Sequence, residues 1–326
     1  MRRRALFVAA SVCFLSASVT AGAQQQPGKK VWRVGYLAGS PRVPQIDAFV
    51  AGLRELGYVE GENVAIELKL AHGQLERLPQ LAAELVRSQP DVIVTAANAG
   101  GLAAKNATST IPIVVISSHD GVGIGLFASL DRPGANVTGI ESLAPDLARK
   151  RLEFLKEAVP KLSRLAVLYN ASDAGAGVYL ELARSVGEQL GFEVQLAGVR
   201  TGDELDAAFA GILRHRPDAL LTVSDPLVFA NRKRIAEFTL QNKLPAVFEP
   251  KAFAELGGLM AYGPNQAQMW RRGAQYADKI LKGAKPAELP VERPTKFVLV
   301  INLRTAKELD LVIPESLLLR ADEVIE

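Results

Sequence analysis

From residue 31 onward, the apolar positions of this chain alternate between two spacings. Short runs such as 91–95 and 113–116 are apolar at consecutive positions, which predicts strands covered on both faces. Longer stretches such as 75–86 repeat leucines every three to four residues, which predicts amphipathic helices. Strands and helices that alternate this regularly predict an α/β fold with parallel sheets and right-handed crossovers.

The expected strands fall into three sections, and the first two are separated where the pattern halts at residues 141–146. The first section covers 31–38, 64–70, 91–95, 113–116 and 137–140, the second covers 165–168, 192–197, 219–223 and 246–248, and the third covers 258–262 and 297–301. We expect a hinge at the halt, around Pro145. A chain of this length also exceeds one comfortable hydrophobic core, so two lobes are expected.

Residues 1–23 have the pattern of a secretory signal. Arginines at 2–4 precede an uncharged stretch over 5–19, and Ala21-Gly22-Ala23 is the small-x-small pattern that a signal peptidase cuts after. A membrane anchor is the alternative, but the apolar stretch is shorter than the roughly 20 residues that span a bilayer. The sequence therefore predicts export with cleavage.

Removal of that segment changes the charge and the thiol content. The chain has 38 Lys+Arg against 35 Asp+Glu, and the three arginines of the signal are the whole excess. A neutral mature chain lacks the clustered cations that nucleic acid requires, so no nucleic-acid partner is expected. The only cysteine, Cys13, lies in the signal and does not follow a lipobox pattern, so the mature chain uses no disulfide.

The segments that follow the expected strands are small, polar and rich in glycine: 39–41, 97–101, 117–121, 170–173, 224–226 and 248–249. Ligands of open α/β sheets bind outside the carboxyl ends of the strands. Small residues allow the amides of the next helix to approach a ligand, and a helix N-terminus favours a carboxylate. Each segment could equally be an ordinary helix cap, but together they predict a cleft.

The sequence provides no setting for catalysis. His119-Asp120 suggests a general base, yet there is no G-x-S-x-G elbow, mature cysteine or S-x-x-K to supply a nucleophile. His72 and His215 have no ligand spacing with His119, so no zinc site is expected. Gly121, Gly123 and Gly125 form an incomplete dinucleotide motif. We therefore predict a protein that is not an enzyme and uses no cofactor or metal.

Aromatic residues are few. Trp32 and Trp270 are expected to pack rather than to stack on sugars. Four rings near strand ends are candidates for a cleft wall, with core packing equally expected for the first: Tyr36, Tyr169, Phe248 and Tyr262. The loops suit a small amphiphile with a carboxylate better than a polyol.

Six segments resemble the ABC-transporter substrate-binding protein family, whose better-known relatives bind tryptophan or tyrosine. They are GLRELGYVEGENVAIE (52–67), RLPQLAAELV (77–86), AAKNATSTIPIV (103–114), GGLMAYGPN (257–265), KILKGAKPAELPVERPTKFVLVINLRTAKEL (279–309) and LLLRADEVIE (317–326). The resemblance implies a type I periplasmic-binding fold, in which two doubly wound parallel-sheet lobes joined by three crossovers close on a ligand. It implies a first lobe of 31–142 plus 258–292 and a second of 143–257 plus 293–326.

One loop departs from the family pattern D-P-V-G-S-G-L-V. Residues 120–127 read DGVGIGLF, so that Gly121 replaces a proline and Ile124 replaces a small hydroxyl residue. Glycine loosens the backbone. We expect this departure at the cleft to bear on the ligand rather than on the fold.

The function implied is that of a periplasmic solute-binding receptor of an ABC importer. It would act as a monomer, present its closed form to a permease in the inner membrane, and bind a small carboxylate-bearing ligand that is amino-acid-like or aromatic. Two alternatives stay open: a periplasmic sensor that presents its closed form to a membrane signalling receptor, and a hydrolase on the same architecture.

The candidate ligand-binding residues come from the strand ends of both lobes. The first lobe supplies Ser40, Asn98, Ala99, Gly100, His119 and Asp120, the second supplies Asn170, Ser172, Ser224 and Asp225, and the hinge supplies Phe248, Glu249 and Tyr262. The amides of Ala99 and Gly100 are expected to hold the ligand carboxylate, and Asp225 to bind an ammonium group.

Overall fold

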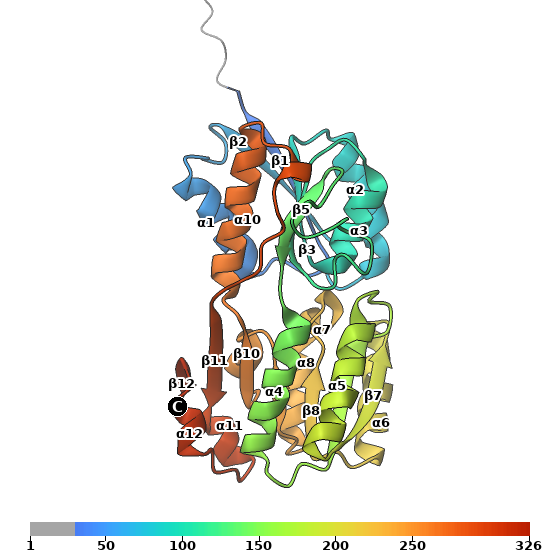
Figure 1. Ribbon diagram of the computed structural model, residues 1–326, viewed down its shortest axis with the longest axis vertical. Coiled ribbons are helices and arrows are strands. Elements are labelled where there is room, and N and C mark those ends of the chain that lie inside the picture. The colour runs from blue at the N-terminus through green and yellow to red at the C-terminus, as the bar shows by residue number, and fades with distance from the viewer. Residues whose placement is uncertain (1–29) are drawn as a thin grey trace, which may run out of the picture. The chain divides into compact units, whose positions relative to one another are not determined.

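The computed structural model describes residues 30–326, so the expected signal at 1–23 lies outside the described residues. The first of two sheets has five parallel strands in the order β2-β1-β3-β4-β5 (Figure 1). They are β1 (Trp32–Ala38), β2 (Val64–Leu70), β3 (Val92–Ala96), β4 (Ile113–Ser118) and β5 (Val137–Glu141). The consecutive apolar runs of β3 and β4 are fully buried because helices cover both faces of this sheet.

Two pairs of helices cover the first sheet, as Figure 1 shows. On one face lie α1 (Pro44–Glu55) and α10 (Gln266–Leu281), and on the other lie α2 (Leu78–Arg87) and α3 (Ala97–Ala107). The leucines at 78, 81 and 85 form the buried side of α2, as their helical spacing predicts.

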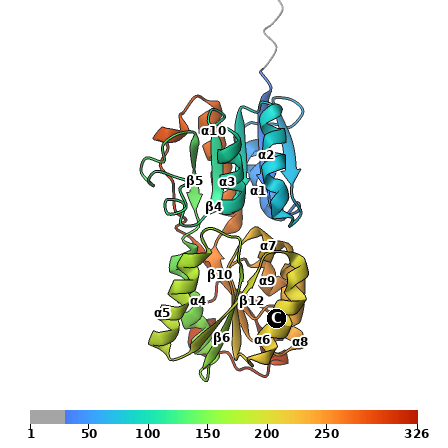
Figure 2. The same ribbon diagram turned by 90° about the vertical axis from the view of Figure 1, so that its right-hand side faces the viewer.

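The second sheet has seven strands in the order β12-β11-β10-β9-β8-β6-β7, and Figure 2 shows helices on both sides of it. The strands are β6 (Arg164–Asn170), β7 (Glu193–Val199), β8 (Ala219–Thr222), β9 (Ala246–Phe248), β10 (Met260–Pro264), β11 (Phe297–Asn302) and β12 (Glu323–Ile325). Its helices are α4 (Ala144–Ala158), α5 (Ala176–Leu190), α6 (Leu205–Arg214), α7 (Pro226–Ala230), α8 (Arg232–Gln241), α9 (Ala252–Glu255), α11 (Leu303–Glu308) and α12 (Glu315–Leu318). The α/β class predicted from the sequence is confirmed.

Two features of the second sheet differ from the expectation. β10 and β11 pair antiparallel, whereas all other pairings of this sheet are parallel. The short edge strand β12 was not expected, because its sequence, Glu323-Val324-Ile325, is too short for an apolar pattern to mark it. Each expected strand overlaps an observed one.

The pairing of β10 corrects one expected lobe boundary. Residues 258–264 were expected in the first lobe, but β10 pairs with β9 and β11 in the second sheet. The chain enters the first lobe only at α10, which packs along α1. The run of apolar residues predicts a strand but carries no information on the sheet that the strand joins.

The chain passes between the sheets at three places. The first follows β5, the second lies between β10 and α10, and the third follows Glu292, which forms a bridge with Ile140 before β11 begins. We call the first sheet with its four helices the first lobe, and the second sheet with its helices the second lobe.

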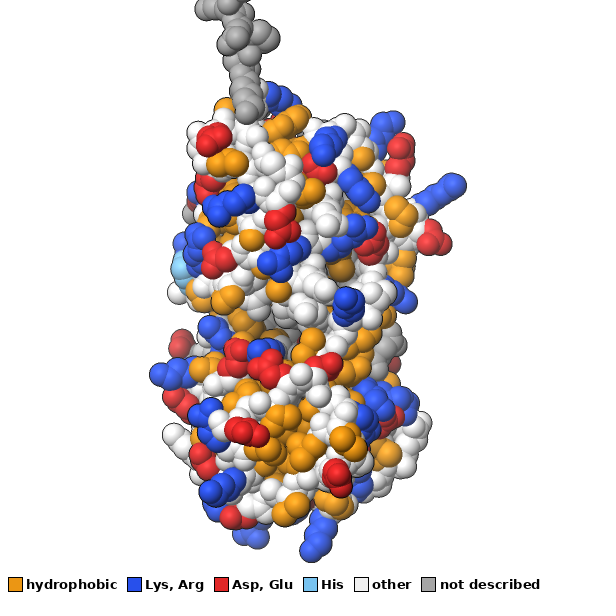
Figure 3. Space-filling model, turned by 90° about the vertical axis from the view of Figure 1, so that its left-hand side faces the viewer, with side chains coloured by type: hydrophobic (Ala, Val, Ile, Leu, Met, Phe, Trp, Pro, Cys, Tyr) orange, Lys and Arg blue, Asp and Glu red, His pale blue; other side chains and the backbone are white. Residues whose placement is uncertain are grey.

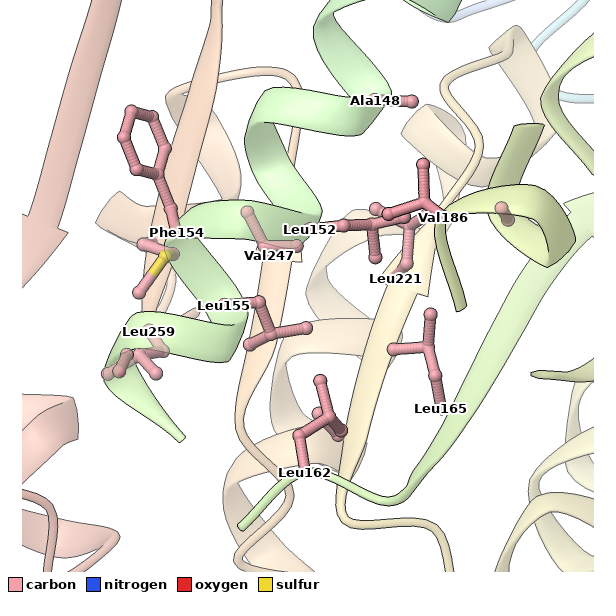
Figure 4. Packing of buried hydrophobic residues seen from close by; sticks show 14 of the residues in the cluster. Ala148, Leu152, Phe154, Leu155, Leu162, Leu165, Val186, Leu221, Val247 and Leu259 are labelled. Atoms are coloured by element: carbon pink, nitrogen blue, oxygen red, sulfur yellow. The ribbon is translucent and has the colours of Figure 1, made fainter. Parts of the chain in front are cut away.

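The largest core cluster lies where α4 crosses the second sheet (Figure 4). Leu152 and Leu155 of α4 are fully buried and face Leu221 of β8 and Val247 of β9. This contact anchors the helix that carries the chain out of the first crossing.

We expect Leu155→Ala to lower the free energy of unfolding by about 2–5 kcal/mol, because it removes fully buried methyl groups and leaves a cavity. Urea denaturation followed by circular dichroism measures this. Leu213→Ala is the matched control, since Leu213 is 40% exposed. Equal losses in the two variants would contradict the packing of α4.

Candidate ligand-binding site between the lobes

A cavity of about 80 Å³ lies between the carboxyl ends of the strands of both sheets. A cavity needs about 10–15 Å³ of such space to hold one water molecule, so this cavity has room for a small organic ligand. Its wall consists of Gly39, Ser40, Val43, Gln45, Ala96, Ala97, Ser117, His119, Ser142, Tyr179, Ser224, Asp225, Pro226, Phe229, Glu249, Pro250, Gln266 and Trp270. Most of these residues directly follow β1, β3, β4, β5, β8 or β9, as the topology of parallel sheets requires.

The backbone is strained on the first-lobe side of the cavity. Ala97 and Ser117 both line it, and both have left-handed φ values, of +61° and +64°. Such a conformation costs a non-glycine residue about 1–3 kcal/mol and concentrates at functional sites. At Ser117 the register between β4 and β5 shifts, which turns the end of β4 toward the cavity.

The N-terminus of α3 faces the cavity through Ala97. Its N-cap, Ala96, provides no side-chain hydrogen bond to the first amides of the helix. Uncapped amides with the positive end of the helix dipole favour an anionic group.

Asp225 enters the wall as the N-cap of α7. Its Oδ1 accepts a hydrogen bond from the Val228 amide at 2.8 Å, and its Oδ2 accepts one from Nδ2 of Asn170 at 2.6 Å. Burial outweighs these bonds and raises the pKa of Asp225 to about 6. The carboxylate is therefore held in place at a cost in solvation that a cationic ligand group would offset.

Glu249 forms a buried ion pair behind the cavity. Its Oε2 accepts a hydrogen bond from Nη2 of Arg151 at 3.1 Å, and the Arg151 side chain is fully buried. Burial raises the pKa of Glu249, and the charges of Arg151 and His119 oppose that rise. No lysine or arginine lines the cavity itself, so its two carboxylates are Asp225 and Glu249, and the cation that pairs with Glu249 lies outside the wall.

Three aromatic rings form the apolar part of the wall. Trp270 donates its indole N–H to the hydroxyl of Tyr36 at 2.7 Å, which fixes the ring against the cavity. Phe229 lies in the wall, and Tyr179 meets the His119 ring edge-on at 5.3 Å. Trp270 was expected only to pack, and Phe229 and Tyr179 were missed.

His119 pairs with a residue that the sequence did not indicate. Its Nε2 lies 2.8 Å from Oδ2 of Asp173, which belongs to the second lobe. The expected partner, Asp120, is turned toward the backbone of Gly123 instead: a Cβ added there would lie 2.4 Å from its carboxylate. The geometry therefore gives no support to a His119–Asp120 base.

Wider hollows adjoin the cavity on two sides. The Asp173 hollow, of about 470 Å³, is lined from both lobes by His119, Asn98, Asn170 and Asp173 among others. The Lys251 hollow, of about 500 Å³, shares Gln45, Phe229, Glu249, Pro250 and Gln266 with the cavity wall. Figure 3 shows the molecule hollowed between the lobes, with acidic side chains along the lower edge.

The candidate residues fall into three groups. Ser40, His119, Ser224, Asp225 and Glu249 line the cavity. Asn98, Ala99, Asn170 and Ser172 line the Asp173 hollow instead. Gly100, Asp120, Phe248 and Tyr262 line neither.

Gly100, Phe248 and Tyr262, which line neither space, make contacts elsewhere in the second lobe or between α3 and β3. A Cβ at Gly100 would lie 2.1 Å from Oγ1 of Thr95, so this glycine serves the close approach of α3 to β3. Phe248 is fully buried and stacks on Phe253 at 4.3 Å. Tyr262 packs edge-on against Phe154 at 5.1 Å. The alternation of a strand turns these rings away from the cleft.

The loop 120–127, whose sequence departs from the family pattern, does not line the cavity either. The Gly121 amide donates to Oε1 of Glu141 at 2.9 Å, and a Cβ at Gly121 would lie 2.6 Å from the Phe127 ring. The glycine therefore permits the packing of Phe127. The expectation that this loop bears on the ligand has no support in the lining of the cavity.

The family model for the ABC transporter substrate binding protein matches residues 37–325. The chain belongs to this family. Its members bind ligands rather than carry out catalysis, and the resemblance drawn from the sequence is confirmed.

Among its relatives, a tyrosine-binding protein of Clostridioides difficile is 26% identical over 81% of this chain and 75% of the relative. A solved domain from Streptococcus pneumonia in complex with L-Trp is 26% identical, with a TM-score of 0.84 over 91% of this chain and all of that one. A ligand-free, open substrate binding protein from Clostridium difficile is 25% identical over 91% and 99% of the two chains, but its TM-score is 0.63. This substrate-binding protein is thus closer in shape to the L-Trp complex than to the ligand-free, open protein.

Two further observations concern residues 30–326 alone. None of their helices combines the length and the apolar character that a bilayer span needs. No cluster of three or more potential ligand side chains in this range is arranged to hold a metal ion.

The raised pKa of Asp225 makes a prediction about pH. The folded state binds this proton up to pH about 6, whereas the unfolded chain loses it near the ordinary value of 3.8, so ionisation of Asp225 opposes folding as pH rises between the two. We expect wild type to lose up to about 3 kcal/mol of stability relative to Asp225→Asn between pH 4 and pH 7. Urea denaturation at each pH measures the difference. A stability difference that does not change with pH would contradict the burial of an ionisable Asp225.

Proposed function

We propose that this protein is the periplasmic solute-binding receptor of an ABC importer and captures a small, amino-acid-like ligand between its lobes. The observation that carries the proposal is the cavity itself, which residues from the strand ends of both lobes enclose. A ligand there contacts both lobes at once, so its binding energy favours the closed arrangement. Family membership and the likeness to the L-Trp complex support this proposal.

The charges of the wall match a zwitterion. An ammonium group would find Asp225, whose buried carboxylate has only amide partners in Val228 and Asn170, and beside it Glu249, which is already paired with Arg151. A ligand carboxylate would find the first amides of α3, starting at Ala97, and the hydroxyls of Ser117 and Ser142. Gly100, expected to share this role, is replaced in the proposal by Ala97.

The apolar part of the wall determines which kind of ligand side chain fits the cavity. Trp270, Phe229 and Tyr179 provide ring faces and edges on which an aromatic or compact apolar group packs. We propose that the protein binds an aromatic amino acid and releases it unchanged to a permease in the inner membrane.

Calorimetric titration of the protein with L-tryptophan, tryptamine and indole-3-propionate tests this proposal. We expect L-tryptophan to bind, and the analogues that lack its carboxylate or its ammonium group to bind about 10- to 100-fold more weakly, since each leaves a charged hydrogen-bonding group unpaired. L-Tyrosine provides a second probe. If neither amino acid binds, the proposed ligand class is wrong.

The variant Asp225→Asn separates the ammonium site from general effects, because Asp225, unlike Glu249, is held by amides and leaves no buried arginine unpaired. It should weaken L-tryptophan while changing indole-3-propionate little, because the propionate carries no ammonium group. Glu237→Gln is the matched control, since Glu237 lies exposed on α8.

Export is tested by expressing the full chain in a Gram-negative host. We expect the mature protein in the periplasmic fraction with its N-terminus at Gln24, because Ala21 and Ala23 form the small-x-small pattern. Ala23→Leu should block processing, whereas Gln26→Leu should not. An uncleaved wild-type chain would contradict the signal.

A further inference from the structure

One hydrogen-bonded pair joins the lobes beside the cavity. His119 follows β4 in the first lobe and Asp173 follows β6 in the second, and their side chains meet at 2.8 Å while only 4% and 6% exposed. Asn98 of α3 adds a longer contact across the same boundary, from Nδ2 to Oδ1 of Asp173 at 3.5 Å. A buried pair of this kind can persist only while the lobes are together.

Asn98 is held in place for this contact. Its Nδ2 donates to the His119 carbonyl, and its Oδ1 accepts from the His119 amide, each at 3.0 Å. These two bonds tie α3 to the end of β4, so Asn98 and His119 present one rigid polar edge to the second lobe.

The second lobe is shaped to meet this edge. A Cβ added at Gly175 would lie 2.6 Å from Cδ2 of His119 and 2.7 Å from Nδ2 of Asn98. A larger residue there would force the side chains of His119 and Asn98 to shift away from Asp173. The Gly175 amide also donates to Oδ1 of Asp173 at 3.2 Å, which orients the carboxylate toward His119.

The pair stands at the edge of the cavity rather than inside it. His119 lines both the cavity and the Asp173 hollow, whereas Asp173 and Asn98 line only the hollow. The bond between the two side chains therefore lies where the cavity and the hollow meet at His119.

We propose that His119, Asp173 and Asn98 form an interlobe latch that holds the cleft closed and slows ligand release. The ligand whose release the latch slows rests on the proposed function, whereas the contact between the lobes does not. Opening the lobes exchanges a buried, charge-assisted hydrogen bond for two solvated groups. Removal of one partner leaves the other buried and unpaired, which favours opening.

The latch depends on pH because both partners titrate. Burial alone would lower the pKa of His119, but the hydrogen bond and charge of Asp173, with smaller contributions from Glu249 and Asp225, raise it. Burial would raise the pKa of Asp173, but the bond and charge of His119 lower it. Arg151 lies behind Glu249, Glu76 and Arg200 line the hollow around Asp173, and Tyr179 packs edge-on against the His119 ring.

The direction of the effect follows from these shifts. Once the lobes part, both groups are solvated and have ordinary pKa values, about 6.5 for His and 3.9 for Asp. The histidine contribution to closure is complete below about pH 6.5 and is lost as pH rises through its raised pKa. The aspartate contribution is complete above about pH 3.9 and is lost as pH falls through its lowered pKa. Closure is therefore strongest between these two values.

The test compares wild type with Asp173→Asn, Gly175→Ala and the control Glu181→Gln, which removes one exposed charge from the same lobe. Small-angle X-ray scattering of the ligand-free full chains at pH 5.5 and pH 8.5 measures the radius of gyration. We expect wild type and the control to be more compact at pH 5.5 than at pH 8.5. We expect Asp173→Asn and Gly175→Ala to be expanded at both pH values.

A second measurement follows ligand release by stopped flow with L-tyrosine, using Trp270 as the reporter. Asp173→Asn should release the probe about 10- to 100-fold faster than wild type. Asp173→Asn removes a charge from the latch, whereas Gly175→Ala adds a methyl group between the lobes. Circular dichroism establishes that each variant is folded.

Wild-type compactness and release rate in a folded Asp173→Asn would overturn the latch. If L-tyrosine and L-tryptophan both fail to bind, the proposed ligand is wrong. The scattering measurement needs no ligand and still decides whether the latch exists.

Discussion

The structure depends on the constraint that two sheets face each other with the carboxyl ends of their parallel strands, from which only β11 and β12 of the described strands depart. Three chain crossings, after β5, after β10 and before β11, impose that arrangement. The carboxyl ends of the parallel strands then deliver the next few residues to the space between the lobes. For this reason loops that are far apart in the sequence, such as those at Ser40, His119 and Asp225, share one cavity wall.

The same constraint explains the electrostatics of the site. A closed cleft removes water from side chains that an open one would hydrate, so burial raises the pKa values of Asp225 and Glu249. Each carboxylate has protein partners, Asn170 for one and Arg151 for the other, which keep it positioned. Burial of this kind costs folding free energy, and it makes the cavity responsive to a ligand of opposite charge.

The sequence predicted the strands and the strand ends well, because apolar runs and small polar loops are local signals. It predicted Glu249 and Asp225 as cavity residues on that basis. Phe248 and Tyr262, which it also proposed, do not line the cavity, since the face on which a strand residue lies depends on the packing of the sheet. It also missed Trp270 and Tyr179, which reach the cavity from the helices α10 and α5.

The position of α10 has a consequence for how the chain folds. This helix covers one face of the first sheet with Trp270, Tyr276 and Ile280, although most of the second lobe lies between it and β5 in the sequence. The first lobe thus has a bare apolar face until synthesis has passed residue 281. Its native contacts are long-range and slow to form, so the growing chain stays without a finished domain for most of its length. This connectivity would therefore give time for the export proposed above, which requires an unfolded chain.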